Sequence, residues 1–356
     1  MSGDFTASTR AFLINIFCSS SLAALAFGCV RHAPASPVRL DAAGRALPPA
    51  LNVGLVLDKG GRDDKSFNSS AFEGAARAAR ELNVRVKTVE SPDDSAFEPA
   101  LRAFAERGFP LVVSIGFAQV DAVKKVAPDF PRIHFAIVDG RVDGPNVANL
   151  LFAEHEGSYL VGYLAGLATK TGKVGFLGGM DIPLIRRFQL AYEAGVKAAR
   201  PSAVVVTNYV GINSAAWANP ARGKELALGQ YDRGADVIFH AAGASGLGAF
   251  DAAEERRLFV IGCDSNQNCL KPGRGLTSML KRVDNAVYDS IKGAAAGKFL
   301  EGVHSFGIAD KGVDYAVDGC NSDLVAPYRG KLEELRRRIV AGEVKAPDYY
   351  EIEKKK

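Results

Sequence analysis

The sequence predicts an α/β fold of two lobes, each containing a doubly wound parallel sheet. The first observation is an alternation that runs from residue 52 onwards, in which short apolar β-rich runs are followed by amphipathic stretches of helical length. Strand followed by helix, repeated many times, is typical of a parallel sheet with right-handed crossovers. The second observation is length, because 356 residues with this many units exceed what one sheet usually holds.

The periodicity of each segment places the elements along the chain. We expect strands at residues 53–57, 85–89, 111–115, 134–138, 147–152, 173–177, 203–209, 237–240 and 259–263. We expect helices at residues 69–82, 97–106, 119–127, 156–171, 184–200, 221–233, 247–255, 283–296 and 326–341. The first lobe should then take residues 51–150 plus about 265–305, and the second should take 151–264 plus about 306–345.

The N-terminus differs from the rest of the chain. Residues 11–27 are mostly apolar or small, and the stretch after Cys29 is rich in Ala, Pro and Arg without periodicity. We expect a signal peptide over residues 1–29 and a disordered tether over 30–50. The run Leu25-Ala26-Phe27-Gly28-Cys29 is similar to a bacterial lipoprotein cleavage box, which predicts an exported protein with a lipid anchor on Cys29. Simple secretion and an uncleaved anchor are the alternatives.

Charge and cysteine usage narrow the class of protein. A formal net charge of +4 is small for this length and predicts no nucleic-acid partner. An exported chain can form disulfides, and Cys263, Cys269 and Cys320 offer one pair that their spacing alone does not choose. The cysteines lack zinc-type spacing, so we expect no metal and no other cofactor.

The turn after the first expected strand has the most informative composition. Residues 58–68 have the sequence Asp-Lys-Gly-Gly-Arg-Asp-Asp-Lys-Ser-Phe-Asn and lead into a helix. Ligands of open α/β sheets lie beyond the carboxyl ends of the strands. Carboxylates accept hydrogen bonds from hydroxyls and a ring stacks on a flat partner, so Asp64, Phe67 and Asn68 suit a sugar joined to an aromatic base. A surface turn with an Asp or Ser cap is the alternative.

Two segments of the second lobe repeat this logic. Residues 173–181 form an apolar run that ends in Gly and Asp, and Phe188 follows in the early turns of the next helix. A flat ligand could lie between Phe67 and Phe188, although a helical Phe is more often a core residue. Gly243 and Gly246 follow another strand and open a helix, so they could bring backbone N–H groups close to a ligand. A tightly packed helix cap is the alternative for these glycines.

Carboxylates recur at the ends of the expected strands. They are Asp58 or Asp64, Asp139, Asp181 and Asp264. One such Asp is usually a helix cap, whereas a set spread over both lobes predicts a polar ligand with several hydroxyls. Lys281 follows a further apolar run and could orient one of these carboxylates, with an ordinary exposed lysine as the alternative.

No catalytic constellation is visible in the sequence. The five histidines are scattered, and neither G-x-S-x-G nor H-E-x-x-H occurs. We therefore expect a binding protein with no catalytic residues, and a hydrolase acting on nucleosides is the less favoured alternative.

Several segments together resemble a known family. They are residues 58–68, 135–139, 171–183, 234–239 and 262–265. These segments are similar to the basic membrane protein family of substrate-binding lipoproteins of ABC importers, whose characterised type binds purine nucleosides. The similarity runs from about residue 52 to about residue 292, and the block at 171–183 is the most specific.

The resemblance implies a type I periplasmic-binding-protein fold, with three hinge crossings and closure of two lobes around a nucleoside. It implies that Asp64, Lys281 and Asp264 hold the ribose and that Phe67 and Phe188 stack on the base, with Phe72 as the alternative to Phe67. It further implies that Asn68 and Asp139 bond the base edge or the sugar, and that Gly243 and Gly246 approach the ligand. The partners would be a nucleoside and an ABC permease, and the receptor would act as a monomer. A sensor of the same fold, reporting to a different membrane partner, is the alternative.

Overall fold

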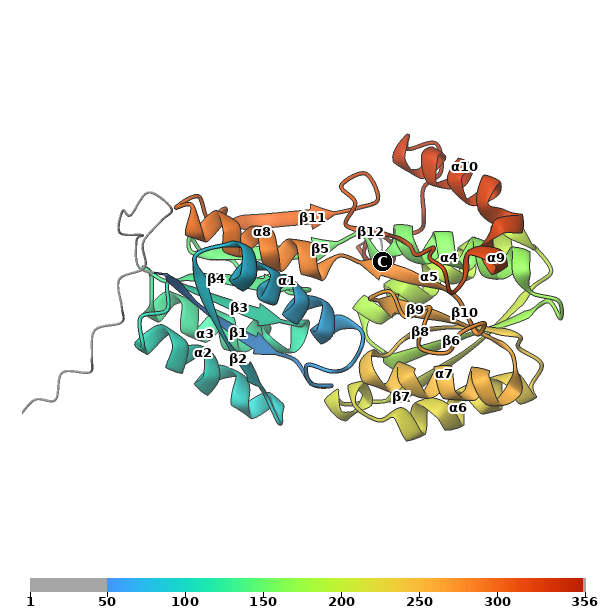
Figure 1. Ribbon diagram of the computed structural model, residues 1–356, viewed down its shortest axis with the longest axis horizontal. Coiled ribbons are helices and arrows are strands. Elements are labelled where there is room, and N and C mark those ends of the chain that lie inside the picture. The colour runs from blue at the N-terminus through green and yellow to red at the C-terminus, as the bar shows by residue number, and fades with distance from the viewer. Residues whose placement is uncertain (1–49, 355–356) are drawn as a thin grey trace, which may run out of the picture. The chain divides into compact units, whose positions relative to one another are not determined.

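The computed structural model describes residues 50–354. These residues contain two six-stranded sheets, and Figure 1 shows that helices flank each of them. We refer to each sheet with its helices as a lobe. The signal peptide over 1–29, its lipidation site Cys29 and nearly all of the tether over 30–50 lie outside the described residues.

The first lobe has the strand order β11-β5-β4-β3-β1-β2, and every neighbouring pair is parallel. Its strands are β1 (Leu51–Leu57), β2 (Val84–Glu90), β3 (Leu111–Ile115), β4 (His134–Val138), β5 (Val147–Phe152) and β11 (Gly302–Phe306). Its helices are α1 (Phe67–Glu81), α2 (Phe97–Glu106), α3 (Val120–Val126) and α8 (Val283–Ala295).

The second lobe has the order β12-β10-β9-β8-β6-β7, in which β12 alone is antiparallel to its neighbour. Its strands are β6 (Lys173–Met180), β7 (Val204–Gly211), β8 (Val237–Ala241), β9 (Phe259–Asp264), β10 (Gly275–Lys281) and β12 (Val313–Tyr315). Its helices are α4 (Glu154–Ala168), α5 (Pro183–Ala199), α6 (Pro220–Asp232) and α7 (Gly246–Arg256). The chain then continues through α9 (Ser322–Val325), α10 (Arg329–Val340) and α11 (Tyr349–Glu353).

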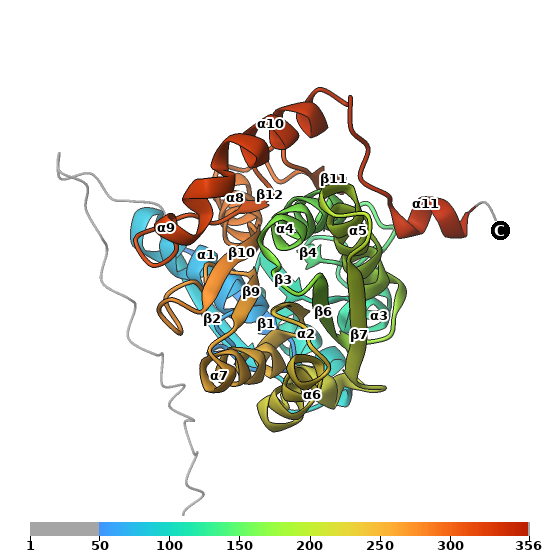
Figure 2. The ribbon, with the colours of Figure 1, turned by 90° about the vertical axis from the view of Figure 1, so that its right-hand side faces the viewer.

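Apolar runs, rather than alternating patterns, form these strands because both faces of each sheet are buried. In β1, Leu55 shares a buried cluster with α1, and the next residue, Val56, shares another with α2 and α3. In β6, Phe176 faces α4 and α5, and Leu177 faces α6 and α7. Figure 2 shows these two helix pairs on opposite sides of the second sheet. The predicted doubly wound architecture is thus confirmed.

The chain crosses between the lobes three times, as the resemblance implies. The first crossing joins β5 to α4, the second joins β10 to α8, and the third joins β11 to β12. Our boundary for the second crossing was wrong, because β10 pairs with β9 and belongs to the second sheet. The chain returns to the first lobe after Lys281, not near residue 265. The apolar run that ends at Leu280 is therefore a strand in its own right.

Two edge strands escaped the sequence analysis. β11 carries exposed and half-buried residues with no apolar run, and β12 is only three residues long. β11 contributes little buried apolar surface, and β12 buries Val313 and Tyr315 but is too short to show a period, so neither produces the local signal on which the prediction depends.

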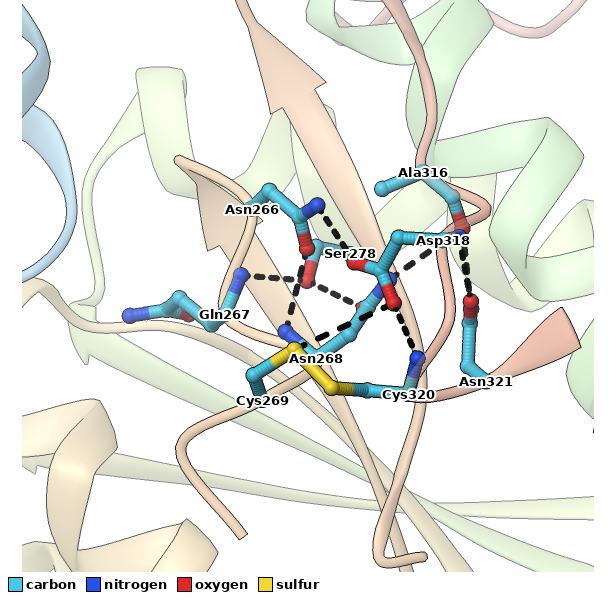
Figure 3. Close-up of a disulfide and its surroundings, with 9 residues drawn as sticks. All are labelled: Asn266, Gln267, Asn268, Cys269, Ser278, Ala316, Asp318, Cys320 and Asn321. Carbon is cyan, nitrogen blue, oxygen red and sulfur yellow. Dashed lines mark hydrogen bonds between the residues drawn. A yellow bond between two sulfur atoms is a disulfide. The ribbon is translucent and has the colours of Figure 1, made fainter. Parts of the chain in front are cut away.

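The structure also defines the pairing of the cysteines that it describes. Cys269, between β9 and β10, is joined to Cys320, between β12 and α9, and Cys263 is a buried free thiol. Figure 3 shows this disulfide within a network of Asn and Asp side chains.

Candidate functional site

A cavity lies between the two lobes, at the carboxyl ends of their strands. Most of the residues that the sequence singles out line it: Asp58, Asp64, Phe67, Asn68, Asp139, Phe188, Gly243, Asp264 and Lys281. Lys59, Gly116, Phe117, Leu184, Ile185, Trp217, Ala241 and Cys263 complete the wall. This is the position at which open α/β sheets bind ligands, because strand-end loops from both lobes converge there.

The turn between β1 and α1 is held by its own side chains. The Asp64 carboxylate accepts hydrogen bonds from the backbone N–H groups of Ser66, Asn68 and Ser69, at 2.8–2.9 Å. Asn68 accepts from the backbone N–H of Asp58 and donates to the carbonyl of Lys59. Asp64 and Asn68 therefore shape the wall from which the Phe67 ring faces the cavity. The sequence favoured a direct ligand role for both residues. The bonds of Asp64 correspond to the Asp cap that was kept as the alternative, and the bonds of Asn68 were not expected.

The charged part of the cavity centres on Lys281, which is 1% exposed. Its ammonium pairs with the carboxylates of Asp139 and, at 3.2 Å, Glu154. Three aromatic rings have their centroids 5.1–5.7 Å from the same nitrogen: Phe67, Phe152 and Phe188. Burial alone would lower the pKa of Lys281, but the neighbouring carboxylates raise it above its usual range. Lys281 is thus a fixed positive charge inside the cavity.

Two aspartates face this charge from different lobes. Asp139 follows β4 and Asp264 ends β9, and both have left-handed backbone angles, with φ of 59° and 66°. Burial raises the pKa of both carboxyls, and that of Asp139 reaches about 7, although Lys281 opposes the shift. One carboxylate oxygen of Asp139, Oδ1, is buried and has no hydrogen-bond partner among the described residues. A buried unpaired acceptor is costly, so this oxygen is suited to receive a donor from a ligand.

Two buried ions behind Lys281, Glu154 and Arg187, were not predicted from the sequence. Glu154 begins α4 directly after the first crossing and pairs with Lys281 on one side and with Arg187 of α5 on the other. Arg187 also donates to the carbonyl of Phe152 and, through two nitrogens at 2.7 and 2.8 Å, to the carboxylate of Asp348. Burial opposes ionisation of Glu154, but the two cations outweigh it and lower its pKa. We call Asp139, Glu154 and Lys281 the hinge side of the cavity.

The other part of the cavity is aromatic. Phe117 follows β3 in the first lobe, and Trp217 follows β7 in the second; their rings meet edge to face with centroids 6.3 Å apart. The indole Nε1–H of Trp217 is buried and has no acceptor among the described residues. Asp58, at the end of β1, lies on this wall too, and burial raises its pKa to about 7. We call Asp58, Phe117 and Trp217 the far side, because β1 lies two positions beyond β4 in the sheet order.

The remaining predicted residues divide between the cavity and the core. Phe188 and Gly243 line the cavity. Of the two alternatives Phe67 and Phe72, Phe67 lines it and Phe72 does not. Gly246 was assigned to the ligand wrongly, because a Cβ there would lie 2.1 Å from the His240 ring, so the glycine serves close packing. Asp181 pairs with Arg186 on the surface, away from the cavity.

A metal centre finds little support in the structure. Among residues 50–354, Cys269, Asp318 and Cys320 form the one group of three potential ligands close enough to share an ion, and the two cysteines are joined in a disulfide. Within the same residues, the helices are all too short or too polar to cross a bilayer.

Comparison with known proteins identifies the family. Residues 51–349 match the Bmp family, described as "ABC transporter substrate-binding protein PnrA-like". The chain belongs to this family. The match extends the resemblance seen in the sequence through the C-terminal segment that carries Asp348.

Relatives of this Bmp-family chain match most of its length. It is 31% identical over 363 residues to a Lactococcus lactis protein named "ABC transporter nucleoside-binding protein BmpA", covering 95% of this chain and 99% of the relative. It is 36% identical over 324 residues to the "CD4+ T-cell-stimulating antigen" of Listeria monocytogenes, covering 84% and 88%. A solved ABC-transporter solute-binding protein from Aeropyrum pernix matches with 31% identity and a TM-score of 0.76, covering 83% of this chain and 94% of that one. The predicted type I periplasmic-binding-protein fold is confirmed by this likeness.

Proposed function

We propose that this protein binds a purine nucleoside in the cavity between its lobes and delivers it to an ABC permease. The observation that carries the proposal is the composition of one cavity, in which aromatic rings and buried carboxylates stand together around a fixed lysine. Rings stack on a flat base, and carboxylates accept hydrogen bonds from sugar hydroxyls. The name of the Lactococcus relative, a nucleoside-binding protein, supports the same ligand class.

Phe67 and Phe188 are placed to hold the base. They come from different lobes, and both have ring centroids within 5.7 Å of the Lys281 nitrogen. A planar group between them would contact an aromatic face on each side, and closure of the lobes would bring the two rings together around it. The Trp217 ring extends this aromatic surface toward the far side.

The ribose would lie against the carboxylates of Asp139 and Asp264, with Lys281 nearby. The unpaired Oδ1 of Asp139 supplies an acceptor for a hydroxyl. A deoxyribose would leave such an acceptor buried and unpaired, at a cost of about 1–3 kcal/mol. We therefore expect ribonucleosides to bind about ten-fold or more tightly than deoxyribonucleosides, since 1.4 kcal/mol corresponds to a factor of ten.

Delivery to a permease requires a location outside the cytoplasm. The N-terminal sequence favours export and lipidation at Cys29, which would keep a monomeric receptor at the membrane surface. We propose this arrangement, and not catalysis on the nucleoside, because the matching family and the Lactococcus relative are both described as binding proteins.

Calorimetric titration of the purified protein tests the ligand class. The protein should first be unfolded and refolded, since a ligand can copurify, and then titrated with adenosine, guanosine, inosine, cytidine, uridine and ribose. We expect saturable binding of the purine nucleosides. Asp264→Asn should weaken binding, because a carboxamide presents an N–H where the carboxylate accepts.

The matched control is Asp289→Asn on the exposed face of α8, which should bind normally. Binding of ribose alone would retain the fold and replace the ligand class. If the whole panel fails to bind, the nucleoside proposal is wrong. Incubation of the bound nucleosides followed by chromatography should recover them unchanged, and release of free base would instead establish a hydrolase.

A further inference from the structure

We propose that residues 265–269 form a disulfide-braced latch that holds the two lobes closed, and that Ser265 and Gln267 thereby act as positioning residues for the ligand. The inference rests on the proposed function for the role of closure in binding. Most of the contacts that carry it lie outside the cavity, in the loop that follows Asp264 between β9 and β10, and one is made by Asp264 itself.

The first step is the set of hydrogen bonds that this loop makes to the other lobe. Ser265 donates through its hydroxyl to the carbonyl of Ser66, at 2.8 Å. Gln267 donates through Nε2 to the carbonyl of Lys65, also at 2.8 Å. In the opposite direction, the Ser66 hydroxyl donates to the carboxylate of Asp264, at 2.7 Å. All three bonds join the second lobe to the turn that begins α1 in the first.

The second step is how firmly the second lobe holds Gln267, which is 1% exposed. Its side-chain oxygen accepts from the backbone N–H of Cys263 and from Nε2 of His240, both at 2.9 Å. Its own backbone N–H donates to the Ser278 hydroxyl at 2.9 Å. With these groups engaged, the amide nitrogen is left to point at the first lobe. The carboxamide is therefore preorganised for the contact with Lys65.

A disulfide and a set of hydrogen bonds brace the loop within the second lobe. Cys269 ties the loop to Cys320, and between them the Asp318 carboxylate accepts from Asn266, Asn268 and the backbone N–H of Cys320, at 2.6–3.1 Å (Figure 3). Cys320 lies just beyond β12, the strand that the chain enters after its third crossing. The loop is thus fixed to the segment beyond β12 within the second lobe, and it cannot move away from Ser66 independently of that lobe.

The latch affects the ligand through two cavity residues that lie next to its contacts in the sequence. Asp264 comes directly before the loop, and Phe67 directly follows Ser66, and both line the cavity. Holding Ser66 against Ser265 therefore fixes the distance between a wall residue of each lobe. A latch of this kind stabilises the closed form, so its loss should speed ligand release and leave capture by the open form unchanged.

The test compares Ser265→Ala with Ser290→Ala, which removes the hydroxyl of another half-buried serine on α8, away from the loop. Trp217 is the one tryptophan of the chain and lines the cavity, so its fluorescence reports adenosine binding and release in stopped flow. We expect Ser265→Ala to raise the dissociation rate about two- to ten-fold, the factor that one net hydrogen bond represents, with the association rate unchanged. The control should match the wild type.

The brace is tested with Cys269→Ser combined with Cys320→Ser. We expect this variant to show faster release and, by small-angle X-ray scattering of the refolded protein without ligand, a larger radius of gyration. A lower melting temperature alone is what a merely stabilising disulfide would produce. Unchanged release rates and radii in both variants would overturn the latch. If adenosine does not bind at all, the nucleoside proposal fails. The latch is then tested by the radii of gyration of the variant and the wild type without ligand, which do not depend on adenosine.

Discussion

The hinge side and the far side of the cavity are built on different principles. On the hinge side, buried ions of both signs pair with one another where the chain crosses between the lobes, so Lys281 has partners before any ligand arrives. On the far side, Phe117 and Trp217 meet across the lobes, and the indole N–H has no acceptor among the described residues. On the hinge side the ions pair within the fold and only one acceptor, Oδ1 of Asp139, has no partner among the described residues, whereas the far side has a donor still to be satisfied.

This difference teaches which residues should affect folding and which should affect binding. A buried ion that loses its partner destabilises the folded chain whether or not a ligand is present. An unpartnered ring N–H makes no stabilising hydrogen bond in the empty protein and gains one only when a ligand accepts from it. Substitutions on the two sides should therefore separate stability from affinity.

The largest effect is expected for Lys281→Met. The methionine fills a similar volume but leaves Asp139 and Glu154 as buried carboxylates without their shared cation. Breaking such a pair costs about 3–5 kcal/mol, and nucleoside binding should be lost with it. Urea unfolding gives the stability and calorimetry the binding. A variant as stable as the wild type would show that the hinge side is not a structural ion cluster.

The converse is expected for Trp217→Phe. The aromatic ring stays and the Nε1–H is lost, so the empty protein should melt at the wild-type temperature. Purine nucleoside affinity should fall about three- to ten-fold, which corresponds to one hydrogen bond to the ligand. Calorimetry is the measurement, because this substitution removes the only tryptophan. Unchanged affinity would mean that the indole N–H meets no ligand acceptor and that the far side contributes ring contacts alone.

Asp58 should make the far side sensitive to pH. Its pKa is about 7 in the folded protein and near 3.8 when exposed, so between these values the folded state binds more protons than the unfolded state. Stability falls as pH rises through this window. Asp58→Asn should therefore raise the melting temperature near pH 8 and have little effect near pH 4. Equal shifts of the melting temperature at pH 4 and pH 8 would contradict the raised pKa of Asp58.

The smallest effect is expected at Asp348, which supports the hinge side from the C-terminal segment. Burial works to raise its pKa, but the bonds and charge of Arg187 outweigh this and lower it. A depressed pKa means that its contribution is present above the unfolded value and is lost as pH falls through the folded one. Because Asp348 is partly exposed, Asp348→Asn should cost only about 0.5–1 kcal/mol near neutral pH and nothing in strong acid. Glu351→Gln, on the short helix that Asp348 precedes, is the control, and denaturant unfolding near neutral pH and in strong acid measures the two variants.

The sequence by itself determined the two-lobe α/β architecture and most of the strand-end residues of the site. Apolar runs, amphipathic periods and Gly-Asp turns are local signals, and each is read within about ten residues. Asp139, Asp264 and Lys281 could be selected because strand ends of such sheets converge at one edge. Phe67 and Phe188 followed from the same argument.

Only the tertiary structure decided how these residues pair and what lies behind them. Lys281 and Asp139 are 142 positions apart, and Arg187 meets Asp348 across 161 positions. Trp217 sits in a short helical segment (Ser214–Trp217), Glu154 begins an ordinary helix, and nothing in their neighbours along the chain marks either one. The same holds for the disulfide, whose pairing was open until β12 placed Cys320 beside Cys269. Contacts of this kind depend on the packing of whole elements, and a local pattern carries no information about which distant partner it will meet.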